Sequence, residues 1–153
     1  MKKSTILSVV ITALLLISSV AYGSEKKEGI KWLTSYDKAV ELSKKEKKPI
    51  FVDFTGSDWC GWCMKLNDEV FSKKSFVDYL EKNFIPLELD FPSKKKQSEE
   101  IKEQNSKLVE KYSVRGFPTI LILDKEGKVL AKTGYQQGGP DNYIKHIKEI
   151  LKK

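Results

Sequence analysis

The sequence predicts an α/β fold in a single domain, because patterns typical of helices and of strands alternate along it. The predicted order is helix, strand, helix, strand, helix, strand, strand, helix, and we find no internal repeat. The chain has 153 residues, of which 40% are hydrophobic and 32% are charged. That is enough apolar material for one compact core and too little chain for two.

Residues 1–23 have the layout of a secretory signal peptide. A basic start, MKK, precedes an apolar run over residues 6–20, and the small-x-small motif AYG ends at Gly23. We expect cleavage after Gly23, which leaves a mature domain over residues 24–153; cleavage after Ala21 is less favoured. The alternative is an uncleaved anchor, but the run is shorter than the roughly 20 apolar residues that span a bilayer. The sequence therefore predicts export, to a periplasm or another extracytoplasmic compartment.

The first half of the mature chain predicts a helix, a strand and a second helix. Residues 34–48, TSYDKAVELSKKEKK, open with Thr-Ser capping candidates and have the pattern of an amphipathic helix. Residues 48–57, KPIFVDFTGS, contain a proline and then a β-branched and aromatic run, which predicts a buried strand followed by a tight turn. In CMKLNDEVF, residues 63–71, strong helix formers place Leu66 and Val70 on one face.

The next segments continue the alternation. A helix is predicted over residues 73–83, KKSFVDYLEKN, and a strand over residues 84–90, FIPLELD. Residues 92–112 form a charged loop that leads into a helix whose apolar positions are sparse. These positions are Ile101, Leu108 and Tyr112.

The C-terminal part predicts a hairpin and a last helix. Residues 119–124, TILILD, and residues 128–134, KVLAKTG, form two strands that KEG joins as a β-hairpin turn. The segment DNYIKHIKEILKK, residues 141–153, is an amphipathic helix. Its apolar face consists of Tyr143, Ile144, Ile147 and either Ile150 or Leu151.

The chain's only two cysteines, Cys60 and Cys63, are three positions apart. Disulfides persist outside the cytoplasm, but a bridge across so short a loop removes little unfolded-state entropy and would stabilise the fold poorly. A structural zinc site needs four ligands, and the chain offers only His146 besides this pair, with polar neighbours that favour a surface position. The spacing thus favours redox chemistry, with a structural disulfide and a metal site as the alternatives; we expect no metal.

The local context of the pair assigns different roles to the two thiols. A strand precedes them and a helix follows, so Cys60 should lie at or just before the helix N-terminus. Unpaired backbone N–H groups and the helix dipole favour a thiolate there. We therefore expect Cys60 to be the partly exposed nucleophile and Cys63, one turn further on, to be the more buried resolving thiol.

Two segments together resemble the thioredoxin-like family. FVDFTGSDWCGWC, residues 51–63, is followed about fifty residues later by YSVRGFPTILILDKEGKVLAKTGY, residues 112–135. The chain is most similar to the exported branch typified by the C-terminal domain of the thiol:disulfide interchange reductase and related single-domain bacterial proteins. The resemblance implies a three-layer α/β/α sandwich with a central mixed sheet of about four strands. It also implies that Cys60 and Cys63 form the redox-active disulfide.

The same resemblance assigns supporting residues. It implies a cis peptide bond between Phe117 and Pro118, beside the cysteines. Asp53 matches the buried acid that helps to deprotonate the second thiol in thioredoxins, although the segment from this acid to the first cysteine is one residue longer here. A local backbone contact is the alternative for Asp53. Trp59 is expected to shield the disulfide by packing or to contact substrate.

The dipeptide Gly61-Trp62 lies between the cysteines, and we expect the Trp62 indole to be exposed and able to contact substrate. The expected chemistry is dithiol–disulfide exchange, which requires no bound cofactor. The leading hypothesis is an exported disulfide reductase that acts on envelope or secreted proteins. A disulfide oxidase or isomerase, or a non-catalytic adaptor or chaperone, is the alternative.

The expected partners follow from this hypothesis. They are disulfide-bonded client proteins and a membrane-embedded electron donor, and we expect a monomer. The formal net charge is +7, and it becomes +5 once Lys2 and Lys3 leave with the signal peptide. Lysines gather at residues 44–48 and 94–96, where solvated faces are favoured over contact with anionic lipid or an acidic partner. Export and the absence of a base-stacking motif argue against nucleic acid.

Overall fold

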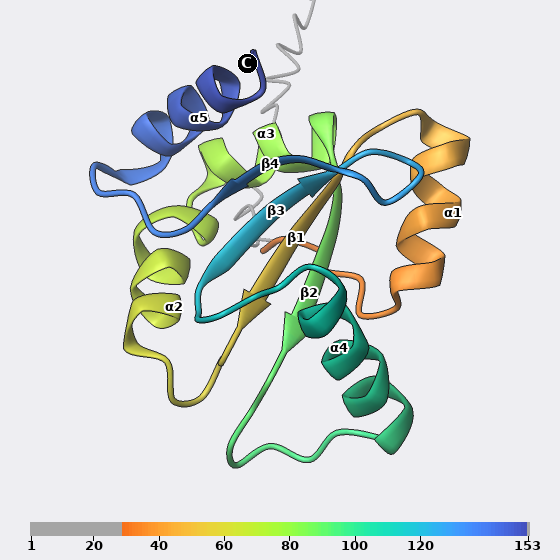
Figure 1. Ribbon diagram of the computed structural model, residues 1–153. Helices are drawn as coiled ribbons and strands as arrows, with labels where there is room; N and C mark the ends of the chain where they lie inside the picture. Colours follow the sequence, from red (N-terminus) through yellow and green to blue (C-terminus); the bar gives the residue numbers. More distant parts are fainter. Residues whose placement is uncertain (1–28, 153) are drawn as a thin grey trace, which may run out of the picture.

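The computed structural model describes residues 29–152 of the chain, so the predicted signal peptide lies outside the described residues. The helices and strands follow the predicted order, with the helical stretch between the first two strands divided into three pieces (Figure 1). In chain order they are α1 (Tyr36–Glu46), β1 (Ile50–Thr55), α2 (Gly61–Leu66), the π-helical segment η1 (Asn67–Phe71), α3 (Lys74–Asn83), β2 (Ile85–Asp90), α4 (Glu99–Lys111), β3 (Thr119–Leu123), β4 (Val129–Thr133) and α5 (Gly139–Ile150).

The sheet has four strands in the order β2-β1-β3-β4, which confirms the predicted mixed sheet. Strand β1 pairs with β2 in parallel and with β3 antiparallel, and β3 and β4 form the antiparallel hairpin. Every residue of β1 is buried. A central strand that is covered on both faces has no side facing solvent, which explains why its sequence is mostly apolar, with Asp53 and Thr55 as buried exceptions.

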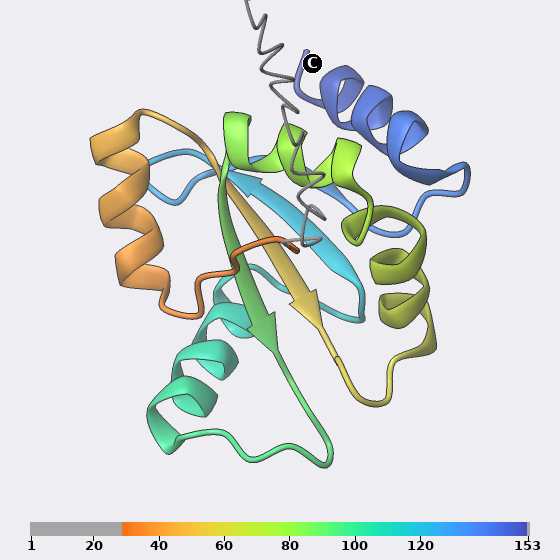
Figure 2. The same ribbon diagram turned by 180° about the vertical axis from the view of Figure 1, so that it is seen from behind.

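Helices cover both faces of the sheet, so the three-layer α/β/α arrangement is confirmed (Figures 1 and 2). Phe51 of β1 packs with the helices α2, η1, α3 and α5, where Phe71 and Phe76 stack with their ring centroids 5.1 Å apart. Val52 and Phe54 point to the opposite face and pack with residues of α1 and α4. Alternate residues of β1 therefore join two separate cores, and its odd-numbered side chains face the α2 layer.

The predicted helix faces are largely confirmed. Ala39 is buried in α1, and Leu66 and Val70 are both buried after the cysteines. The π-helical form of η1 was not predicted; it places Val70 and Phe71, adjacent in sequence, together in the core. In α5, Tyr143 and Ile147 are buried, Ile150 packs against the core and Leu151 is exposed. Within residues 29–152, no helix has both the length and the apolar character needed to cross a membrane.

Candidate active site

The loop between β1 and α2 carries the cysteine motif and begins with a tight turn. The backbone N–H groups of Trp59 and Cys60 both donate to the Gly56 carbonyl oxygen, at 3.2 and 2.9 Å. A Cβ atom on residue 56 would come within 2.5 Å of the Trp59 ring. Glycine at this position therefore lets the indole lie across the turn.

Cys60 and Cys63 form a disulfide, with an S–S distance of 2.11 Å and a Cα–Cα distance of 5.2 Å. Cys60 is the N-cap residue of α2, as predicted, and its sulfur accepts a hydrogen bond from the Cys63 backbone N–H at 3.2 Å. A backbone donor at the helix N-terminus is thus already directed at the sulfur that would carry the negative charge after reduction.

The expected difference in exposure between the two cysteines is not present. Cys60 and Cys63 are both buried, each with 6% of its surface exposed. The Cys60 side chain turns back over the first helical turn to bond Cys63 and to accept its N–H, instead of projecting outward. Burial therefore does not distinguish the two sulfur atoms in the oxidised protein, although Cys60 lies at the N-cap of α2 and Cys63 within the helix.

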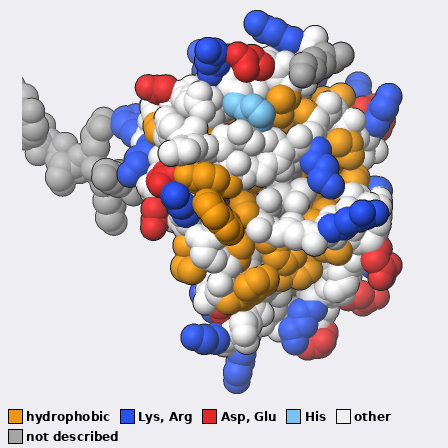
Figure 3. Space-filling model, turned by 60° about the vertical axis from the view of Figure 1, so that its left-hand side comes forward, with side chains coloured by type: hydrophobic (Ala, Val, Ile, Leu, Met, Phe, Trp, Pro, Cys, Tyr) orange, Lys and Arg blue, Asp and Glu red, His pale blue; other side chains and the backbone are white. Residues whose placement is uncertain are grey.

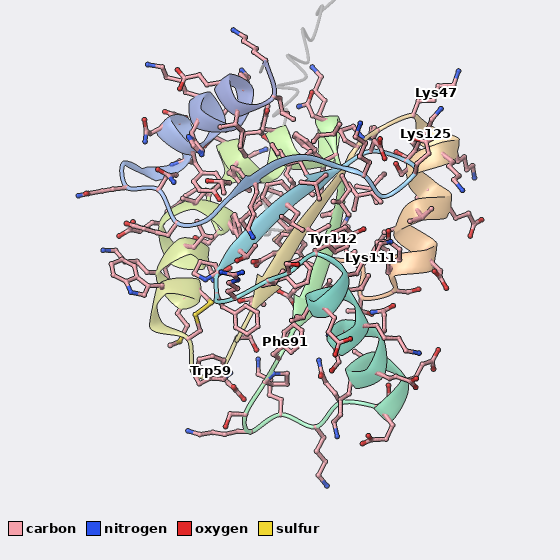
Figure 4. The ribbon with its side chains drawn as sticks, viewed as in Figure 1. Lys47, Trp59, Phe91, Lys111, Tyr112 and Lys125 are labelled. Atoms are coloured by element: carbon pink, nitrogen blue, oxygen red, sulfur yellow. A yellow bond between two sulfur atoms is a disulfide. The ribbon has the colours of Figure 1, made fainter. Side chains whose placement is uncertain are left out.

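Aromatic side chains connect the motif loop with the predicted cis-proline. The Phe117–Pro118 peptide bond is cis, as predicted. The Phe117 ring meets Trp59 edge-on at 6.0 Å and stacks on Phe91 at 5.0 Å, with an interplanar angle of 23°. The Trp59 indole N–H donates to the Phe91 carbonyl oxygen at 2.7 Å (Figure 4). The proline loop, the cysteine loop and the end of β2 therefore form one aromatic group.

Both tryptophans beside the cysteines remain largely exposed. Trp59 is 52% exposed although its ring contacts Phe117, and Trp62 is 58% exposed, as expected for it. The Trp62 ring lies 5.2 Å from Tyr135, and Lys65 Nζ is 5.2 Å from the centroid of each of these rings. A Cβ atom on Gly61 would meet no heavy atom within 4 Å. Figure 3, which brings the α2 side forward, shows apolar side chains gathered over this face.

Asp53 lies in a cavity of about 200 Å³ that it shares with Cys63. The carboxyl is buried, and its Oδ1 has no hydrogen-bond partner. Burial raises the pKa of Asp53 well above its ordinary value of 3.8, and the negative charges of Glu88 and Asp90 raise it further. Glu88 is the register partner of Asp53 on β2, and burial also raises its pKa. Besides Asp53 and Cys63, the residues lining the cavity are Trp32, Thr55, Ser57, Met64, Asn67, Asp68, Phe71 and Glu88.

His146 is the one residue outside this site for which the sequence expectation needs correction. It is half-buried instead of lying free on the surface, with Nε2 2.8 Å from Thr133 Oγ1 and its ring 6.3 Å from that of Tyr143. Its polar helical neighbours gave no sign of this contact with β4, because the two segments meet only in the fold. Nowhere in the described part of the chain do three His, Cys, Asp or Glu side chains gather as metal ligands would.

Comparisons with known proteins agree with this geometry. The chain matches the thioredoxin-like domain family over residues 36–150. The chain belongs to the thioredoxin-like family. It is 42% identical over 118 residues to the disulfide bond reductase DsbH of Chlamydia pneumoniae, covering 77% of this chain and 71% of that protein. It is 28% identical to the thiol:disulfide interchange protein DsbD of Pseudoalteromonas atlantica, covering 88% of this chain but only 22% of that longer protein.

A solved structure described as the DsbH oxidoreductase has the same fold. It superposes with a TM-score of 0.77 at 40% identity, covering 82% of this chain and 86% of that chain. The protein described here also has the disulfide that this chemistry requires, between Cys60 and Cys63 of its Cys-x-x-Cys motif. This thioredoxin-like protein is therefore a thiol:disulfide oxidoreductase, and the adaptor hypothesis loses its support.

The sequence did not reveal how the loop after β2 is fastened to the active site of this thioredoxin-like domain. The Asp58 carboxylate accepts three backbone N–H groups, those of Ser93, Lys94 and Lys95, at 2.8, 2.7 and 3.1 Å. These hydrogen bonds lower the pKa of Asp58. Asp90 at the end of β2 accepts from the Ser57 backbone N–H and hydroxyl at 2.9 and 2.6 Å.

A sequence signal for part of this site exists in retrospect. The carboxyl ends of adjacent parallel strands meet at one edge of a sheet, where ligands commonly bind. Predicting that β1 and β2 are parallel neighbours would have placed Glu88 beside Asp53, and Asp90 beside the motif loop. The capping role of Asp58 had no comparable signal, because its partners are backbone groups about 35 residues away.

Proposed function

We propose that this protein is an exported disulfide reductase. The Cys60 thiolate attacks a client disulfide, forms a mixed disulfide with one client sulfur and releases the other as a thiolate. The Cys63 thiolate then attacks Cys60, which releases the second client sulfur and forms the Cys60–Cys63 disulfide. The client gains two electrons and the cysteine pair loses two, so the oxidised protein must be reduced again by a donor.

The direction of transfer is supported chiefly by the residues between the cysteines. An oxidising member of this fold holds its nucleophile strongly as a thiolate, which stabilises the reduced form. Neither Gly61 nor Trp62 can carry a positive charge, and Lys65 is engaged with the Trp62 and Tyr135 rings and lies 3.8 Å from Glu69 Oε1. Only the helix N-terminus is left to favour the thiolate, so we expect a moderate depression of the Cys60 pKa.

Asp53 is proposed as the base that takes the proton from Cys63. Resolution of the mixed disulfide requires Cys63 as a thiolate, although a free thiol ionises only near pH 8.5. A carboxyl whose pKa is raised by burial is a better-matched proton acceptor than an ordinary aspartate. The shared cavity of Asp53 and Cys63 supports this role.

The cellular setting belongs to the same proposal. Export depends on the signal peptide expected over residues 1–23. Outside the cytoplasm the electrons would come from a membrane-embedded donor, and the clients would be disulfide-bonded envelope or secreted proteins. The name of the DsbH relative, a disulfide bond reductase, supports this direction.

Insulin reduction and equilibration with glutathione test the proposal together. We expect insulin to be reduced, Cys60→Ser to abolish the activity, and the potential to lie nearer about −270 mV, as in thioredoxin, than about −120 mV, as in a strong periplasmic oxidant. A potential above roughly −180 mV, the value typical of an isomerase, would instead support the oxidase or isomerase alternative.

A further inference from the structure

A row of lysines lies beside the active site, on the loop between β2 and α4. Lys94, Lys95 and Lys96 are all exposed, and we call these three residues the lysine rim. The loop begins at Phe91, whose ring belongs to the aromatic group at the cysteines.

The rim is held in place by hydrogen bonds to the cysteine loop. Asp58, two residues before Cys60, accepts the backbone N–H groups of Lys94 and Lys95 at 2.7 and 3.1 Å. Lys95 Nζ donates to Ser57 Oγ at 2.9 Å, and Gln97 Nε2 donates to the Asp90 carbonyl oxygen at 3.0 Å. A loop that is already ordered loses little conformational entropy on binding, so its charges can contribute to recognition.

Two of the three rim lysines, Lys94 and Lys96, have charges that no neighbouring carboxylate pairs with among the described residues. The Asp58 carboxylate stays negatively charged while it accepts the N–H groups of the loop, and it offsets part of the charge of Lys95; these N–H groups and the Lys95 charge both lower the pKa of Asp58. Lysines on α4 differ from Lys94 and Lys96: Lys102 and Lys107 each pair with a glutamate of the same helix, Glu99 and Glu103.

An apolar surface lies directly against this charge. The aromatic group of Trp59, Phe91 and Phe117 is continuous with the loop, and Figure 4 shows the labelled Trp59 and Phe91 beside it. A partner that fits both features has an apolar side chain near its cysteine and acidic residues a few positions away. Charges of opposite sign steer such a partner to the site and raise its rate of association.

We propose that the lysine rim selects client segments whose disulfide is flanked by acidic residues. This inference rests on the proposed reductase function and names its preferred substrate class. The attraction acts before the chemical step, so it changes kcat/KM for charged clients and leaves the exchange reaction itself unaltered. It weakens as salt shortens the screening length, which is about 10 Å at 0.1 M and about 3 Å at 1 M.

The test compares three disulfide peptides of one length, with glutamates, glutamines or lysines around the same disulfide. The rim variant is Lys94→Gln/Lys96→Gln, which leaves Lys95 and its Ser57 contact in place. The matched control is Lys44→Gln/Lys45→Gln, which removes the same charge from exposed positions on α1, across the sheet from α2 (Figure 1). All are made in the full mature chain.

We expect the wild type to reduce the acidic peptide about tenfold faster, in kcat/KM, than the basic one at 50 mM salt, and nearly equally at 0.5 M. The rim variant should lose most of this preference, while the control and the rate on the glutamine peptide stay unchanged. Equal preferences in the rim and control variants would overturn the inference. So would rim-dependent binding to phosphatidylglycerol vesicles without peptide preference, since the rim would then contact membrane.

Failure of the reductase proposal can be told apart from failure of this one. If the glutamine peptide is not reduced by any form of the protein, the proposed function fails. Binding of the alkylated acidic peptide, measured against salt, then still tests the rim. Tighter binding of the acidic peptide that the rim variant loses supports recognition, and equal binding of acidic and basic peptides refutes it.

Discussion

Replacing Asp53 by asparagine should stabilise the folded protein increasingly as the pH rises. Asp53 is buried beside two other acids, and its Oδ1 has no partner. Its pKa is therefore higher in the folded than in the unfolded chain, so the folded state binds the extra proton and loses stability as the pH rises above 3.8. Between pH 3.8 and the raised pKa of Asp53 in the folded protein, each pH unit lowers the free energy of unfolding of the wild type by about 1.4 kcal/mol relative to that of the asparagine variant.

The assay is urea unfolding of the oxidised protein at pH 4 and at pH 7, with the disulfide intact in both forms. We expect the free energy of unfolding of Asp53→Asn, relative to wild type, to rise between these pH values. Asp58→Asn is the control: three backbone N–H groups lower the pKa of Asp58 below 3.8, so its contribution to stability is lost only as the pH falls below 3.8, and the relative stability of this variant should change little between pH 4 and pH 7. A relative stability of Asp53→Asn that stays constant within about 0.5 kcal/mol over this range would refute the reasoning.

Three further outcomes are expected. Glu88→Gln removes a negative charge that raises the pKa of Asp53. The acidic limb of the pH–rate profile for resolution of the mixed disulfide should therefore move to lower pH, whereas Glu88→Asp should leave this limb nearly in place. Cys63→Ser should accumulate a mixed disulfide with the client, visible on a non-reducing gel; rapid release of the client would contradict its resolving role. A Gly61→Pro/Trp62→His swap should raise the reduction potential measured against glutathione, and an unchanged value would remove the argument from the dipeptide.

Local patterns were sufficient to predict most of the fold. The order of helices and strands, the strand before the cysteines and the helix after them all follow from periodicity and turn residues within windows of about ten residues. The π-helical form of η1 escaped prediction because it depends on Val70 and Phe71 fitting one core together. The cis bond at Pro118 came from family resemblance, since X–Pro bonds are cis in only about 5–6% of cases.

The candidate site could be predicted only where its residues are close in sequence. Cys60, Cys63 and Trp62 form one short motif, and the exposed position of Trp62 followed from it. Glu88 and the loop after β2 were missed because strand pairing brings them to the motif from about 30 residues away. The equal burial of the two cysteines was also unforeseen, since it depends on which way the Cys60 side chain turns.

The extra residue between Asp53 and Cys60 does not separate the acid from the cysteine pair. The chain between them turns at Gly56, whose carbonyl accepts the backbone N–H groups of both Trp59 and Cys60. Ser57 and Asp58 within this turn are in turn held by the end of β2 and the loop that follows it. Asp53 consequently still lines one cavity with Cys63. Asp58 of the same turn also holds the lysine rim through the backbone N–H groups of Lys94 and Lys95, so one short segment positions both the cysteine pair and the rim.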